Sequence, residues 1–244
     1  MDSAPKPDPK SKEEITPVSS SNWMAGERKY YLSNSTYDIG EFLGKTDIKP
    51  FQIINIVFKK GVYKWDKPYC TPQNCTINMI GENFKNGGKD NVVTIVMIEK
   101  HSYIESYDKK EYCKNWRFQI SNNSIVTIQG IDIIEKINDS REITKNADNI
   151  GVFTVYNSKF FLLQCKVEIS SSPFINIPSL SIGSVYFGHT RFDKNAQADK
   201  KEITIVGTET GWDFKGNKAI VSKSHTYINS GCILEKNPKI EYID

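Results

Sequence analysis

Three charged residues occupy the same position in a recurring sequence pattern, which would bring them together on one surface. Asp132, Lys159 and Arg191 each follow a tight bend and precede an inward-facing hydrophobic residue. A carboxylate, an ammonium and a guanidinium in one column would supply a base and positive charge beside a sugar carboxylate, which are the needs of a polysaccharide lyase. The alternative is a surface salt-bridge ladder that contributes about 0–1 kcal/mol per pair. Both interpretations stay open, and the three residues are candidate catalytic groups.

Aromatic and hydroxyl residues form a second set of candidates, because rings stack on the apolar faces of sugars while hydroxyl groups take hydrogen bonds. The candidate substrate-binding residues are Tyr156, Tyr186, Tyr227 and Trp212. Tyr186 and Tyr227 share an outward row of the pattern with Thr127 and Thr154. Exposed β-strands favour the same residue types without any ligand, and Trp212 could equally belong to an end cap.

The histidines and cysteines do not predict a metal site or a cofactor. His101, His189 and His225 are far apart in the chain, and no second close cysteine pair accompanies Cys70 and Cys75. No glycine-rich phosphate loop or Ser-His-Asp arrangement is visible. We expect the five cysteines to be mostly buried free thiols, although Cys70 and Cys75 could form a disulfide in an oxidising compartment.

The elements that must position these residues are short β-strands. From residue 28 onward, runs of about 4–8 β-branched and aromatic residues, such as Ile53 to Phe58, alternate with Gly, Asn, Asp, Ser and Pro. One segment, Tyr37 to Leu43 and extending toward Lys49, has the periodicity of a short helix. The sequence therefore predicts a nearly all-β chain.

An internal repeat determines how these strands are arranged. The pattern apolar-x-apolar-x-x-small-x-apolar begins at Val126, Phe153 and Val185, and more weakly at Thr226, with spacings of about 27 to 41 residues. Two short strands joined at a bend cannot bury their apolar side chains by themselves, but coils stacked on one another bury these side chains in a continuous apolar column. Because hairpin dipeptides are nearly absent, we favour a parallel β-helix over an antiparallel sandwich.

The first half of the chain resembles the initial coils of right-handed parallel β-helix proteins of the pectate-lyase-like superfamily. The resemblance lies in Phe51–Trp65, Cys75–Asn83 and Val93–Ile95, and it extends over residues 50 to 193 and more weakly over 194 to 244. It implies an all-β, right-handed parallel β-helix solenoid that forms one domain over residues 27–244, with a short N-terminal capping helix. The superfamily includes polysaccharide lyases, galacturonases, pectin methylesterases and virus tailspikes.

The catalytic motifs of that superfamily are mostly missing. Gly188-His189-Thr190 is similar to the Gly-His-Gly element of galacturonases, which makes His189 a fourth candidate catalytic residue. The alternative is that His189 is a solvent-facing turn residue. No adjacent Asp-Asp pair accompanies it, and neither the calcium-binding acids nor the arginine motif of the lyases is present. We therefore expect a carbohydrate-recognising or structural module of a virion spike or cell surface, with a polysaccharide lyase or glycoside hydrolase as the alternative.

Composition limits the partners of this 244-residue chain. A formal net charge of +3 gives no reason to expect nucleic acid, and no apolar stretch is long enough for a membrane span. Residues 1–26 are polar and proline-rich and are predicted to be a flexible or docking tail. They lack the pattern of a signal peptide, so we expect that an export signal is either absent or was removed. The polar stretch Glu135 to Asn149 is predicted to be an insertion between coils, which is either a binding site or a solvated charged loop. Expected partners are a polysaccharide or surface glycan and a homo-oligomer (trimer) or larger assembly formed through residues 1–26, in an extracellular, cell-surface or virion location.

Overall fold

The computed structural model describes most of the chain after its N-terminal 25 residues. The described residues are 26–33, 38–82, 91–99, 118–137, 152–178, 182–198, 201–208, 218–223, 225–234 and 239–243. They contain three stacked sheets, here sheets A, B and C, a separate two-stranded sheet and a short helix α1 (Ile39–Lys45). Residues 1–25 of the predicted tail lie outside the described residues.

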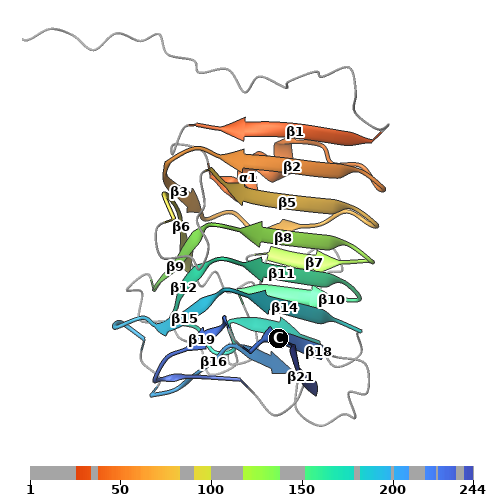
Figure 1. The fold of residues 1–244 in the computed structure, drawn as a ribbon. Helices are drawn as coiled ribbons and strands as arrows, with labels where there is room; N and C mark the ends of the chain where they lie inside the picture. The colour runs from red at the N-terminus through yellow and green to blue at the C-terminus, as the bar shows by residue number, and fades with distance from the viewer. Residues whose placement is uncertain are drawn as a thin grey trace, which may run out of the picture.

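Sheet A is the longest of the three sheets. In spatial order it contains β1 (Glu27–Leu32), β2 (Ile53–Phe58), β5 (Thr76–Gly81), β8 (Ile125–Gln129), β11 (Lys159–Leu163), β14 (Ser184–Gly188), β18 (Lys218–Ser222) and β21 (Lys239–Ile243). Figure 1 shows these strands stacked one above the other along the length of the molecule.

Sheets B and C complete each turn of the coil. Sheet B contains β3 (Gly61–Trp65), β6 (Val93–Glu99), β9 (Asp132–Ile137), β12 (Lys166–Ile169), β15 (Arg191–Lys194) and β19 (Tyr227–Ile228). Sheet C contains β4 (Tyr69–Cys70), β7 (Phe118–Ser121), β10 (Phe153–Tyr156), β13 (Ile175–Ile177) and β17 (Val206–Thr208), and β16 (Ile203–Thr204) pairs with β20 (Cys232–Ile233). Neighbouring strands pair in parallel, so the predicted all-β parallel β-helix solenoid is confirmed.

Alternation along each strand explains why the coils stack. In β2, the side chains of Ile54, Ile56 and Phe58 are fully buried, whereas those between them are partly exposed. A strand places successive side chains on opposite faces, so every second residue enters the interior. A register shift of one residue would expose this whole apolar set, which is why the coil register is strongly specified.

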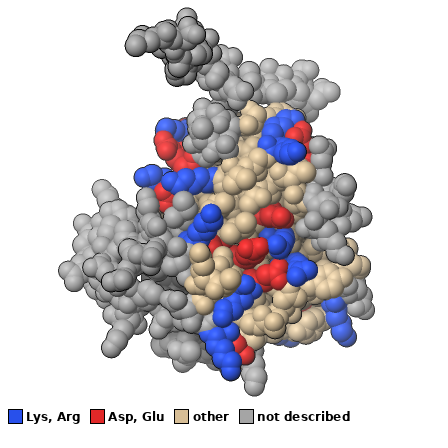
Figure 2. Space-filling view, turned by 90° about the vertical axis from the view of Figure 1, so that its left-hand side faces the viewer, with Lys and Arg blue, Asp and Glu red and all other residues tan. Residues whose placement is uncertain are grey.

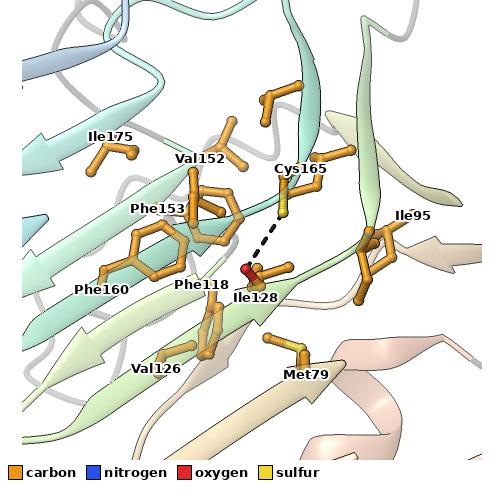
Figure 3. Packing of buried hydrophobic residues seen from close by; sticks show 14 of the residues in the cluster. Met79, Ile95, Phe118, Val126, Ile128, Val152, Phe153, Phe160, Cys165 and Ile175 are labelled. Carbon is orange, nitrogen blue, oxygen red and sulfur yellow. Dashed lines mark hydrogen bonds between the residues drawn. The ribbon is translucent and has the colours of Figure 1, made fainter. Parts of the chain in front are cut away.

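Aromatic rings form the centre of the core (Figure 3). The Phe153 ring lies 4.7 Å from the Phe160 ring and 5.3 Å from the Phe174 ring, measured between centroids. The Trp65 ring lies 4.9 Å from that of Phe118. These residues come from four successive turns of the chain, so their contacts join the coils into one core.

The coil turns at residues that adopt the left-handed backbone conformation. At the corner from sheet A to sheet B these are Gly130, Gln164 and His189, with φ of 65°, 56° and 51°. At the corner from sheet C to sheet A they include Asn74 and Asn157, with φ of 54° and 48°. Glycine adopts this conformation without strain, and asparagine tolerates it better than most residues.

Helix α1 covers the N-terminal end of the core, as predicted, although it runs from Ile39 to Lys45 rather than from residue 37. The Asp38 side chain accepts a hydrogen bond from the Glu41 backbone N–H at 3.0 Å and so caps the helix. Phe42 packs edge-on against Tyr30, with 5.5 Å between ring centroids. Gly40 is required by a close approach, because an added Cβ would lie 1.9 Å from the Lys67 carbonyl oxygen.

The cysteine predictions are confirmed in part. Cys75, Cys165 and Cys232 are buried free thiols, and the Cys165 thiol donates a hydrogen bond to the Ile128 carbonyl oxygen at 3.4 Å (Figure 3). Cys70 is disulfide-bonded, so the free-thiol prediction is wrong for this residue. Because Cys75 is free, the suggested bridge between Cys70 and Cys75 is also wrong.

Candidate functional site

Six polar residues line the outer face of sheet B and form the candidate site. We call this set the sheet B ladder: Asp132, Lys166, Glu168, Arg191, Asp193 and Asn229. Strand register places Lys166 beside Arg191 and Glu168 beside Asp193. Ladder residues that are paired on neighbouring strands are separated by the inter-strand spacing of about 4.8 Å. Figure 2 shows this side of the molecule, on which acidic and basic side chains lie close together.

The ladder faces outward because the side chains of the residues between its members are buried in the core. Ile133, Val167 and Phe192 are at most 1% exposed, and each stands between two outward positions of its strand. The same alternation that builds the core thus presents one polar side chain every second residue. The rigid coil fixes the position of each ladder residue relative to the next.

Asp132 is partly buried at one end of the ladder. Its carboxylate accepts a hydrogen bond from the Asn91 side-chain amide at 2.9 Å, and that amide also donates to the Gln164 carbonyl oxygen at 2.9 Å. Burial raises the pKa of the Asp132 carboxyl above its ordinary value. The Asn91 hydrogen bond and the nearby Lys166 oppose this shift without cancelling it.

Asp193 has the opposite environment. The Arg191 guanidinium donates to its two carboxylate oxygens at 2.9 and 3.3 Å, and the Asn229 amide donates to it as well. Burial of Asp193 favours a higher pKa, but these donors and the charge of Arg191 outweigh it, so the pKa of Asp193 is lowered.

The remaining cation of the ladder is also paired. Lys166 Nζ lies 2.8 Å from a carboxylate oxygen of Glu168. This hydrogen bond raises the pKa of Lys166, and the charges of Asp193 and Asp132 act in the same direction. The ladder is therefore a network in which each cation neutralises a carboxylate on its own strand.

Two carboxyl groups with opposite pKa shifts lie on one face of the ladder. Asp132 is on β9 and Asp193 is on β15, with only β12 between these strands. Their strands are therefore roughly 10 Å apart, which is two inter-strand spacings. Environments that move the pKa values of two carboxyls apart are the usual basis for separate acid and base roles.

The predicted column of Asp132, Lys159 and Arg191 is wrong in one member. Asp132 and Arg191 lie on the same face of sheet B, but Lys159 begins β11 in sheet A, where it pairs with Ile125 and Ser184. The repeat copy that begins at Phe153 crosses the corner from sheet C to sheet A, whereas the other two cross from sheet A to sheet B. Lys166 occupies the place that was predicted for Lys159.

His189 lies at the corner between β14 and β15. Its ring stacks on that of His225, with 4.1 Å between centroids and 27° between planes. The positive φ of His189 shows that it forms the bend, two residues before Arg191. Its catalytic role stays a prediction.

The predicted outward row of tyrosines and threonines is divided among three sheets. Tyr186 lies in sheet A and stacks on Phe161, with 4.3 Å between ring centroids. It shares a lane with Thr127, where a lane is a row of residues that are paired from strand to strand. Tyr227 lies in sheet B directly beside Arg191, and 57% of its surface is exposed. Thr154 is on sheet C, where it is 1% exposed.

The other two candidates are placed differently. Tyr156 ends β10 of sheet C, away from the sheet B ladder, and Trp212 lies outside the described residues. Glu135, the first residue of the predicted binding insertion, is buried in β9 and accepts hydrogen bonds from the Ser170 and Ser171 backbone N–H groups at 2.7 and 2.9 Å. Residues 138–149 of that insertion are also outside the described residues.

Sequence reasoning missed the ladder residues Lys166, Glu168, Asp193 and Asn229. A usable signal was present in the bend residues, because Gly130, Gln164 and His189 each stand two positions before an outward residue of sheet B. Among the described residues, no group of three or more His, Cys, Asp or Glu side chains is arranged to hold a metal ion.

Comparisons with known proteins add little beyond this geometry. No protein family and no curated protein matches the chain. Two crystal structures of the pectin methylesterase from Aspergillus niger, in deglycosylated and penultimately deglycosylated forms, are similar to it with TM-scores of 0.41 and 0.39. Each is 16% identical in sequence and aligns over 90% of this chain and 85% of its own.

At that similarity, neither structure carries an argument about function.

The part of the chain that is described contains no helix long and apolar enough to cross a membrane. The sheet topology of the chain itself establishes its architecture, which is a parallel β-helix.

Proposed function

We propose that the protein is a carbohydrate-recognising β-helix module that binds a glycan along the sheet B ladder. The observation that supports this proposal is the row of oriented donors and acceptors repeated from β9 to β15 at a fixed spacing of about 4.8 Å. A chain of linked sugars is a repeating ligand, and a rigid polar row on successive coils is a repeating surface.

The chemistry of the ladder suits sugar hydroxyl groups, which donate and accept hydrogen bonds at once. Carboxylates accept, guanidinium and ammonium groups donate, and the Asn229 amide does both. Arg191 is held by two hydrogen bonds to Asp193, so little conformational entropy is lost when a ligand binds. The exposed Tyr227 ring beside Arg191 offers an apolar face for stacking.

The charge balance of the ladder favours a neutral glycan over a polymer of sugar acids. Lys166 is paired with Glu168, and Arg191 is paired with Asp193. Asp132 adds a third carboxyl to these two pairs. Because neither cation of the ladder is left to neutralise a ligand carboxylate, a uronate would meet no net positive charge there.

The test is a binding screen of the full chain against matched neutral and uronate polysaccharides, by affinity electrophoresis and then calorimetry. We expect binding to a neutral glycan, and we expect Asp193→Ala and Tyr227→Ala each to weaken it about tenfold or more. Lys159→Ala, on sheet A, is the matched control and should bind as the wild type does. Binding that survives both sheet B substitutions, or that is lost on Lys159→Ala, would contradict the proposal.

Hydrolysis of the bound glycan is the second candidate function, favoured by the opposite pKa shifts of Asp132 and Asp193. In this mechanism Asp132, with the raised pKa, donates a proton to the departing sugar oxygen, and Asp193 acts as the base toward water. Release of reducing ends from the polysaccharide panel would establish it, and Asp132→Asn should then abolish release. Binding without release of any product supports the non-catalytic module.

We also propose an extracellular, cell-surface or virion location. The disulfide at Cys70 supports it, because disulfides persist in oxidising compartments and are rare in the cytosol. Labelling of intact cells or particles with an antibody to the protein tests the location. Detection only after the cells are lysed would contradict it.

A further inference from the structure

Within the part of the chain that the structure describes, the two ends of sheet A present strand edges without a partner strand. Among the described residues, β1 pairs only with β2, and β21 pairs only with β18. Figure 1 shows β1 at one end of the stack and β21 at the other. A free edge exposes a row of backbone N–H and C=O groups that can pair with a strand from another chain.

The register of sheet A relates the two edges residue by residue. Following the pairs from strand to strand, Glu27 of β1 occupies the same lane as Lys239 of β21. By the same pairs, Lys29 shares its lane with Glu241. If the stack were continued by another copy, both lanes would place opposite charges side by side.

We propose that β1 of one copy adds in parallel to β21 of a second copy, so that the molecules associate end to end. In this contact Glu27 faces Lys239 and Lys29 faces Glu241. Opposite charges that face each other across neighbouring strands stabilise pairing, and like charges weaken it. The occupant of the free edge is thus a second copy of this chain, selected by charge complementarity.

Apolar groups at the C-terminal end also favour the contact. Tyr242 is 59% exposed although it continues the inward lane of Val221, which is 2% exposed. The lane of Tyr242 leads at the other end to Tyr30, whose ring packs on Phe42 of α1. End-to-end contact would bring the two tyrosines together and remove apolar surface from water.

The charged groups at these edges are already oriented. Glu241 accepts hydrogen bonds from Lys218 and Lys239, each at 3.0 Å, and these bonds lower its pKa. Glu27 accepts a hydrogen bond from the Asn55 amide at 2.6 Å. The two carboxylates are therefore held at their strand edges before any partner arrives.

An interface between two different patches forms a closed ring or an open chain, depending on how the patches are placed. Because β1 and β21 are distinct surfaces at opposite ends, each added copy leaves a new free edge, and association is open-ended. Successive copies would align their outer faces, so a ligand that spans several copies would gain avidity. The end-to-end contact does not depend on the proposed glycan function.

Sedimentation velocity of the full chain over a wide concentration range tests the proposal. We expect the weight-average mass to rise with concentration without stopping at a dimer or trimer. Lys239→Glu should weaken association about fivefold or more, because it places two carboxylates in one lane. Glu27→Lys should do the same, and the double variant Glu27→Lys/Lys239→Glu should restore association by exchanging the charges.

Lys159→Glu is the matched control, because it makes the same charge change in the same lane but within the sheet. It should leave association unchanged, and circular dichroism should show that every variant keeps its strand content. A monomer at all concentrations, a mass that stops at a closed dimer or trimer, or a double variant that fails to recover would each overturn the proposal.

Discussion

The buried carboxylate of Glu135 provides the most demanding test of how the coil holds its shape. Glu135 is 1% exposed, and its carboxylate accepts the backbone N–H groups of Ser170 and Ser171 and the Ser171 hydroxyl group. These bonds tie β9 to the corner that follows β12, and both strands carry residues of the sheet B ladder. Glu135→Ala would remove all three acceptor contacts at once.

The magnitude follows from the donors left behind. A donor that loses its partner in a buried position costs about 1–3 kcal/mol. Glu135→Ala would leave the buried N–H group of Ser170 and the partly buried N–H and hydroxyl groups of Ser171 without their acceptor. Water entering the cavity recovers part of this cost, so we expect Glu135→Ala to lower the free energy of unfolding by about 3–5 kcal/mol. Glu135→Gln keeps one acceptor oxygen and should lower it by about 2 kcal/mol.

The assay is urea-induced unfolding followed by circular dichroism and tryptophan fluorescence. Glu168→Gln is the matched control, because it makes the same chemical change at a partly exposed ladder position and should change stability by less than about 1 kcal/mol. A loss below about 1 kcal/mol for Glu135→Ala would refute the view that this carboxylate fixes the corner.

Three further predictions test the core, the helix and the ladder. Phe153→Ala should lower the free energy of unfolding by about 3–5 kcal/mol in urea unfolding, because it leaves a cavity among four rings; a loss under about 1 kcal/mol would contradict a continuous core. Gly40→Ala should lower the free energy of unfolding by about 2–3 kcal/mol in the same assay, because the new Cβ would overlap the Lys67 carbonyl group. Gly44→Ala is the control, since the space around Gly44 is open, and it should be neutral or slightly stabilising. Equal effects of the two substitutions would count against the close approach at Gly40. The Asp132→Asn variant should gain stability relative to the wild type as the pH rises from the ordinary carboxyl pKa of 3.8 through the raised pKa of the folded state. The reason is that only the wild type must ionise a partly buried carboxyl group over this range. If thermal melts show a stability difference that stays constant over this range, burial does not raise the pKa.

The parallel β-helix could be predicted from the sequence because its physical cause is local. Alternation in segments such as Ile53–Phe58 specifies one buried face, and the scarcity of hairpin dipeptides argues against antiparallel connections. The short helix after residue 37 could be recognised for the same reason. These features depend on neighbours within a few positions of one another.

The composition of the ladder could not be predicted as reliably, because it depends on which corner of the coil a repeat crosses. Both corners are flanked by apolar-x-apolar pairs, so hydrophobicity alone did not separate Lys159 from Lys166. The bend residue separates them, since Asn157 precedes the former and Gln164 precedes the latter. The partner of Asp132, Asn91, lies 41 residues earlier in the chain, and only the fold brings the two together.

The central claim is that glycan binding occurs on sheet B, and hydrogen exchange of the full chain with and without a bound neutral glycan tests it most directly. We predict that the glycan slows amide exchange in β12, β15 and β19, next to the ladder and Tyr227, and leaves sheet A unchanged. Slowed exchange confined to sheet A, or no glycan-dependent change in sheet B at saturating ligand, would contradict the claim.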